Sequence, residues 1–73
     1  MVRSITETEK AAITRATSNA GVTITGYSVT TDTNGQETFY IGLEPERLVS
    51  SNMRKRLRES LTTDHIVVNG IRV

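Results

Sequence analysis

Residues 44–61 are predicted to form an amphipathic helix between two strand-like segments, and this constrains the fold more than any other feature of the chain. At 3.6 residues per turn, its apolar side chains share one face and three arginines stack along the adjoining flank. The apolar face holds Val49, Met53, Leu57 and Leu61, and the flank holds Arg47, Arg54 and Arg58. Pro45 suits a first helical position, but Ser50-Ser51-Asn52 is weak helix material. The segment therefore predicts either one helix from Pro45 or a short turn followed by a helix from Ser51.

An N-terminal helix is predicted to begin near Ile5 or Thr6. Ser4 with Glu7, and Thr6 with Glu9, both have capping-box spacing, so two starting registers compete. Gly21 is well placed as the left-handed residue that ends the helix. The inward stripe consists of Ile13, Ala16 and Ala20, with Ala12 at its margin.

Residues 22–43 predict a β-hairpin whose register follows from its hydrophobic pattern. A two-residue turn at Asn34-Gly35 would mix polar and apolar side chains on both faces of the hairpin. A three-residue loop with Gly35 in a left-handed conformation instead places Val29 opposite Phe39 and makes one face apolar. With a bulge near Gly26, that face holds Val22, Ile24, Tyr27, Val29, Phe39, Ile41 and Leu43. The other, solvated face holds Ser28, Thr30, Thr38 and Tyr40.

The C-terminal residues 65–73 predict one further strand, because residues 66–68 are all β-branched. A right-handed crossover would place this strand parallel to the second hairpin strand or next to the first. The expected fold is therefore α+β, a two-layer α/β sandwich in the order helix, strand, strand, helix, strand. We expect a three-stranded sheet with both helices on one face, in a single compact domain of residues 1–73.

The closing pattern Val67-x-Asn69-x-Ile71-x-Val73, with Asn34-Gly35 in the hairpin, resembles part of the BON domain. That domain is a small lipid- and protein-binding module of cell envelopes. The resemblance covers the hairpin and the last strand. The chain departs from it where the family usually has a glycine-valine pair, since Thr62-Thr63-Asp64-His65 stands there. From the composition of its first residues we also expect no export signal. On its sequence the chain is therefore assigned to no family.

Composition excludes several classes of function. The 73 residues include no cysteine and one histidine, so neither a disulfide framework nor an ordinary zinc site is available. No glycine-rich phosphate loop is present, and His65 stands alone without a catalytic partner. We therefore expect a protein that is not an enzyme and has no cofactor or metal. Since the N-terminus lacks an apolar leader and no apolar stretch could cross a bilayer, we also expect cytoplasmic localisation and no membrane insertion.

Two kinds of binding surface remain. A sheet edge can add a strand from another chain, and Leu48 projects away from the apolar face of its helix. The basic cluster around the second helix either binds phosphates or only solubilises that face, since a net charge of +1 does not by itself predict nucleic-acid binding. The predicted function is protein–protein binding or self-association, as a homodimer or an accessory or regulatory subunit, through a sheet edge or the second helix. The alternative is nucleic-acid binding. The candidate surface consists of Arg47, Arg54, Lys55, Arg56, Arg58, Leu48 and Tyr40.

Overall fold

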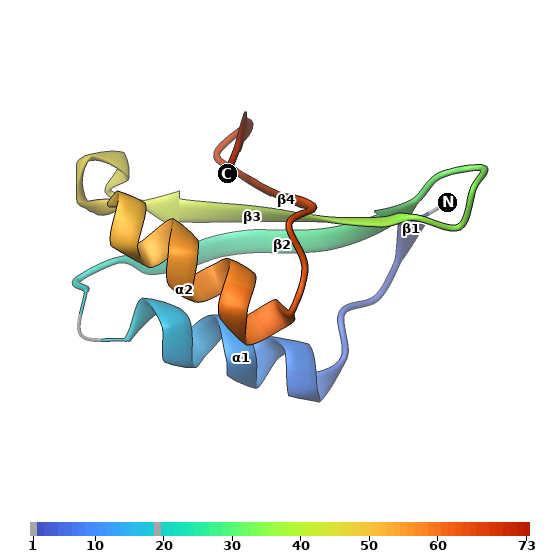
Figure 1. The fold of residues 1–73 in the computed structure, drawn as a ribbon. Helices are drawn as coiled ribbons and strands as arrows, with labels where there is room; N and C mark the ends of the chain where they lie inside the picture. Colours follow the sequence, from blue (N-terminus) through green and yellow to red (C-terminus); the bar gives the residue numbers. More distant parts are fainter. Residues whose placement is uncertain (1, 19) are drawn as a thin grey trace.

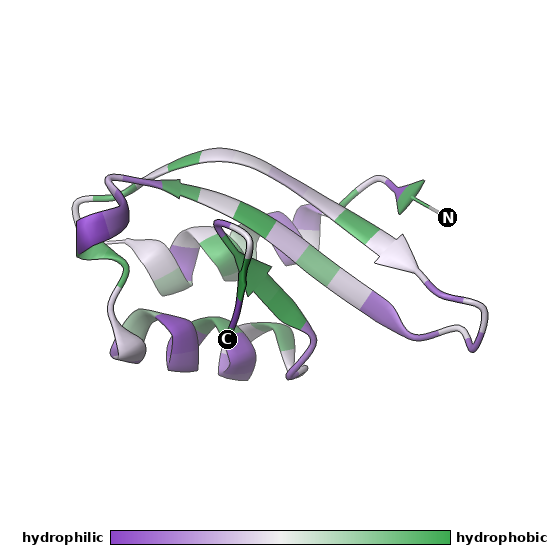
Figure 2. Ribbon diagram, turned by 90° about the horizontal axis from the view of Figure 1, so that it is seen from above, coloured by the Kyte–Doolittle hydropathy of each residue, from purple (hydrophilic) through white to green (hydrophobic). Residues whose placement is uncertain are grey.

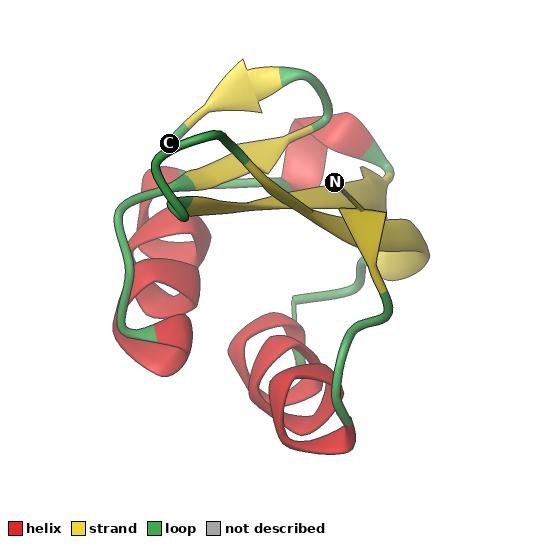
Figure 3. Cartoon of the chain, turned by 90° about the vertical axis from the view of Figure 1, so that its right-hand side faces the viewer, coloured by secondary structure: helices red, strands yellow, loops and turns green. Residues whose placement is uncertain are grey.

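The computed structural model describes residues 2–18 and 20–73, which form two helices packed on one face of a sheet (Figures 1 and 3). The elements are β1 (Val2–Arg3), α1 (Glu7–Thr17), β2 (Thr23–Thr31), β3 (Glu37–Glu44), the 3₁₀ turn η1 (Glu46–Leu48), α2 (Ser51–Leu61), β4 (Ile66–Val68) and β5 (Ile71–Arg72). Within these residues five strands form the sheet, in the order β1-β2-β3-β4-β5. The expected three-stranded sheet is therefore wrong. A two-residue strand is added at each edge.

The last strand predicted for residues 65–73 is a hairpin instead. Asn69 and Gly70 have φ values of 52° and 81°, and two successive left-handed residues form the tight turn that joins antiparallel strands. β4 ends at Val68, and β5 turns back so that Ile71 pairs with Val68. Asn-Gly is the strongest sequence signal for such a turn, but the β-branched run before it favoured one continuous strand.

The other unpredicted strand, β1, is held by Arg3. It pairs with Val29 of β2, and its guanidinium bonds to Glu9 of α1 and Glu37 of β3. The Nη2 atom lies 2.8 Å from Glu9 Oε2 and 3.1 Å from Glu37 Oε1, and the guanidinium carbon lies 5.8 Å from the Phe39 ring centroid. The ion pair holds the pKa of Glu9 down at about 2. One side chain thus ties β1 both to the following helix and to β3, which is distant in sequence.

The predicted register of the β2–β3 hairpin is confirmed. Val29 lies opposite Phe39, Gly35 has a φ of 82°, and a bulge interrupts the pairing between Ile24 and Gly26. The assignment of Tyr27 to the core is wrong, since this residue is 38% exposed. Its ring lies at the outer margin of the sheet, with Lys10 Nζ of α1 6.0 Å from the ring centroid.

The helices follow one of the two alternatives left open for each. α1 begins after the Thr6–Glu9 capping box and ends at Thr17, with Ser18 as its C-cap residue. Ala20 therefore lies outside the helix. Gly21 is left-handed as predicted, with a φ of 75°, but it lies beyond the C-cap and does not end the helix. The basic segment is a short turn followed by a helix, with Ser50 as the N-cap of α2. The core is formed by Ile13, Ala16, Val29, Phe39, Ile41, Leu43, Val49, Met53, Leu57, Ile66 and Val68.

The crossover through α2 places β4 parallel to β3, the first of the two predicted positions. Asn69 extends this pairing, because its main-chain N–H donates to Ile41 O at 3.0 Å. Its side-chain amide donates to Leu43 O at 3.0 Å and accepts from Leu43 N at 2.9 Å. In the part of the chain that the structure describes, no helix is both long and apolar enough to span a membrane.

Candidate functional site

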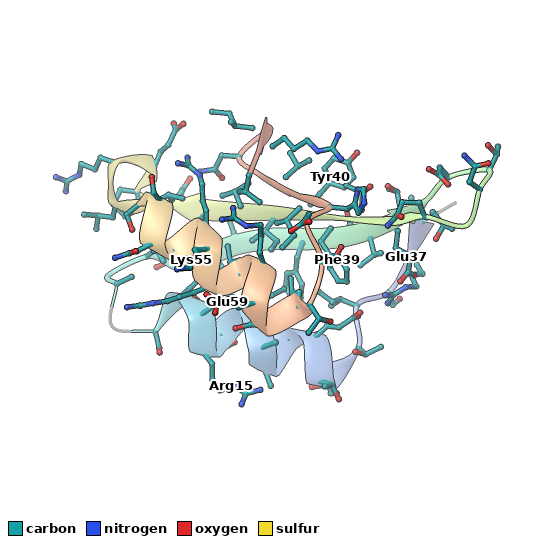
Figure 4. The ribbon with its side chains drawn as sticks, viewed as in Figure 1. Arg15, Glu37, Phe39, Tyr40, Lys55 and Glu59 are labelled. Atoms are coloured by element: carbon teal, nitrogen blue, oxygen red, sulfur yellow. The ribbon has the colours of Figure 1, made fainter. Side chains whose placement is uncertain are left out.

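The predicted candidate residues lie in three elements and on two faces of the molecule. α2 carries Arg54, Lys55, Arg56 and Arg58, η1 carries Arg47 and Leu48, and β3 carries Tyr40. Figure 4 shows Tyr40 at the sheet and Lys55 on α2, in the helical layer. Tyr40 is 43% exposed and lies on the sheet, away from the helical layer. Tyr40 therefore cannot stack a base beside the arginines.

The predicted arginine stripe is shorter in the structure. Because α2 begins at Ser51, Arg47 belongs to η1 and does not continue the helical flank of Arg54 and Arg58. Leu48 is 39% exposed, as expected for a side chain outside the core. Its Cδ1 would lie 3.4 Å from a Cβ placed at Gly21, so the loop after α1 covers part of it.

The cations of α2 have no anionic partner within the described residues. Arg54 and Arg58 are half-buried, whereas Lys55 and Arg56 are exposed. In residues 2–18 and 20–73 the ion pairs are those of Arg3 with Glu9 and Glu37, and of Lys10 with Glu7. The Nε atom of Arg54 is buried without a hydrogen-bond partner among the same residues. This helix therefore presents an uncompensated positive charge.

A hollow of about 470 Å³ between the helices brings a further cation to this surface. Arg15 and Ala16 of α1 line one side, and Arg56, Glu59 and Ser60 of α2 line the other. Figure 4 shows Arg15 on α1 and Glu59 on α2. Sequence reasoning did not single out Arg15, because a lone arginine in the last turn of a helix is ordinary. Only the packing of the two helices places it opposite Arg56.

The outer edge of β2 is largely free. β1 pairs only with Val29 and Thr30, and in the described chain no strand borders residues 23–28 on that side. Figure 2 shows β1 beside only the end of β2 that leads into the hairpin turn. A free edge of this kind offers unpaired main-chain groups to another strand.

The main-chain groups of Tyr27 point to this free edge. Phe39 N donates to His65 O at 2.9 Å, so the main chain of Phe39 points toward β4 and away from β2. Its register partner, Val29, points the opposite way and pairs with Arg3 of β1. Tyr27 lies two residues before Val29, on the same side of the strand. Its N–H and C=O therefore face outward where β1 does not reach.

The uncovered face of the sheet contains two adjoining hollows. One, of about 360 Å³, lies over Gly26 and Gly42 and next to Tyr40. The other, of about 730 Å³, lies at the η1 end and includes Glu44 and Glu46 in its lining. Neither glutamate forms an ion pair within the described residues, and His65 lines neither hollow.

His65 lies at the other end of β4, where Arg72 Nη2 donates to its Nδ1 at 3.1 Å. Within residues 2–18 and 20–73, no three histidine, cysteine, aspartate or glutamate side chains are grouped so as to hold a metal ion. The candidate features are therefore surfaces: the free edge of β2 and the cationic side of the helices.

Comparisons of this chain with protein-family models, curated proteins and solved structures found no match.

Proposed function

We propose that this chain is a non-enzymatic interaction module that self-associates by pairing the free edge of β2 with the same edge of a second copy. The outward-facing main chain of Tyr27, which no strand borders within the described residues, carries this proposal. Strand addition at such an edge forms main-chain hydrogen bonds without requiring a sequence motif.

A second copy suits this edge because antiparallel pairing of identical strands obeys two-fold symmetry. In such a dimer both copies use the same surface, and each supplies donors and acceptors to the other. The half-exposed Tyr27 ring lies beside the edge and would lose further apolar surface on association.

The association should be weak. The free segment covers only residues 23–28, and the bulge between Ile24 and Gly26 interrupts its regular geometry. Interfaces that bury less than about 1,200 Å² in total belong to transient complexes. We therefore expect dimers at high protein concentration and monomers on dilution.

The sheet edge is favoured over the second helix for a protein contact. The exposed large apolar side chains within the described residues are Val2, Tyr27, Tyr40, Leu48 and Ile71, none of which lies in α1 or α2. The cores of protein interfaces are poor in charged residues, whereas the outer side of α2 is cationic. That charge instead favours the second candidate function, nucleic-acid binding.

The test is molecular mass measured by light scattering during gel filtration, over a range of protein concentrations at low and high salt. Strand pairing predicts a concentration-dependent dimer that is nearly insensitive to salt. Tyr27→Pro should abolish it, because proline removes the outward N–H without removing a hydrogen bond inside the sheet. Tyr27→Ala is the matched control, since it also removes the ring but keeps the N–H.

Equal effects of the two substitutions, or a wild-type monomer at the highest concentration, would contradict the proposal. Circular dichroism verifies that both variants fold. If Tyr27→Pro does not fold, hydrogen exchange of the wild-type protein decides instead. The Tyr27 amide should gain protection with concentration, whereas the Ser28 amide, which is bonded inside the sheet, should be protected throughout.

A further inference from the structure

We propose that the outer side of the two helices binds the phosphate backbone of duplex nucleic acid. This surface, called here the cationic helical face, consists of Arg15, Arg54, Lys55, Arg56 and Arg58. It is independent of the β2 edge, because it lies on different elements.

The charges of this face are available to a ligand. None of its five cations forms an ion pair within the described residues, and Glu59 is the one acidic side chain of α2. Elsewhere the arrangement is different: Arg3 and Lys10 are neutralised by Glu7, Glu9 and Glu37. The small net charge of the chain thus conceals a strongly uneven distribution.

The cations are spread around the solvent side of α2, with Arg56 on the flank toward α1 and Arg54 and Arg58 on the other flank. The eleven residues of α2 extend over about 16 Å, and duplex DNA carries about one charge per 1.7 Å of axis. Arg56 faces Arg15 across the hollow of about 470 Å³ between the helices. Lys55 and Arg58 line a second hollow of about 350 Å³ at the C-terminal end of α2, together with Glu59 and Asp64. Guanidinium groups at both hollows can donate two hydrogen bonds to one phosphate.

Other polyanionic partners fit this face less well. Membrane-surface helices insert apolar side chains between lipids, but no large apolar side chain of α1 or α2 is among the exposed ones in the described chain. Binding of single strands depends on aromatic side chains that stack on bases, and Tyr40 lies on the opposite layer. A duplex needs neither, because its phosphates alone supply affinity.

The experiment is a fluorescence anisotropy titration of a short labelled duplex DNA of arbitrary sequence. If about four phosphates are contacted, the slope of log affinity against log salt is about −3.6, and affinity falls roughly 100-fold between 50 and 200 mM salt. Arg56→Gln and Arg15→Gln should each reduce the slope by about 0.9. Glu59→Gln should strengthen binding, since it removes the anion between these cations.

Arg72→Gln is the matched control, because it removes the same charge from β5, on the other side of the molecule. It should leave the salt slope unchanged. An effect of Arg72→Gln equal to that of Arg56→Gln, a wild-type affinity independent of salt, or tighter binding to anionic vesicles than to duplex DNA would each overturn the proposal. Circular dichroism of each variant verifies that the fold is retained.

Discussion

Replacing Gly42 with alanine should destabilise the domain, whereas the same change at its cross-strand partner Gly26 should not. The two glycines lie opposite each other in β3 and β2, and neither has a left-handed φ. A Cβ at Gly42 would lie 2.4 Å from Thr25 Oγ1, but a Cβ at Gly26 would have no atom within 4 Å. Because the substitution is the same at both positions, a difference in stability between the two variants reports the steric clash at Gly42 and not the loss of a glycine.

The expected size follows from two opposing terms. Restoring an ordinary non-bonded contact requires a movement of roughly 1 Å at Thr25, and overpacking a close contact costs about 1–3 kcal/mol. A glycine-to-alanine change also stabilises by about 0.4–1 kcal/mol, because it restricts the unfolded chain. Gly42→Ala should therefore lower the free energy of unfolding by about 1–2 kcal/mol, and Gly26→Ala should raise it by up to about 1 kcal/mol. For a domain of this size, such a loss lowers Tm by about 4–16 °C.

The assay is urea unfolding followed by circular dichroism for both single variants, for Thr25→Ala and for the Thr25→Ala/Gly42→Ala double variant. Because Thr25→Ala removes the clashing oxygen, the double variant should recover about 1 kcal/mol relative to additivity. The reasoning is refuted if Gly42→Ala is as stable as the wild type, if Thr25→Ala gives no relief, or if Gly26→Ala is equally harmful.

Three further predictions concern the core, the turn between β4 and β5, and the stability of the domain at acidic pH. Leu57 is fully buried, so Leu57→Ala should cost about 2–5 kcal/mol in urea unfolding, and a loss below about 1 kcal/mol would contradict the packing described above. Asn69→Ala should cost about 2–3 kcal/mol, because it removes both amide bonds to Leu43 and places an alanine at a φ of 52°; Asn69→Gly should recover only the backbone part. Arg3 lowers the pKa of Glu9 from 4.5 to about 2, so the stabilisation by this ionised carboxyl is present above pH 4.5 and is lost as the pH falls through about 2. Arg3→Gln should flatten this part of the stability–pH profile, and parallel profiles for variant and wild type would show that the ion pair contributes nothing.

Local features could be predicted from the sequence because their causes lie within a few residues. The register of the β2–β3 hairpin follows from side-chain alternation and the left-handed Gly35, and the capping box of α1 needs only Thr6 and Glu9. The apolar face of α2 is likewise a matter of helical period. Asn69-Gly70 belongs to the same class, since its turn signal was present in the sequence but was outweighed by the strand propensity beside it.

The features that sequence reasoning missed depend on contacts between distant residues. The exposure of Tyr27, the neighbourhood of Arg15 and Arg56, and the separation of Tyr40 from the arginines are set by how the layers pack. None of these has a local pattern. The structure separates the candidate residues, because Tyr40 lies on the sheet and the arginines lie in the helical layer. That any of them forms a binding surface stays a prediction.

By itself, the sequence determined the type of the main elements, the register of the long hairpin and the inward face of α2. Tertiary structure alone decided β1, the free edge of β2 and the gathering of cations between the helices. The physical reason is that a two-residue strand has no hydrophobic period. Its pairing comes from main-chain hydrogen bonds, and β1 is anchored through Arg3 to a residue 34 positions away.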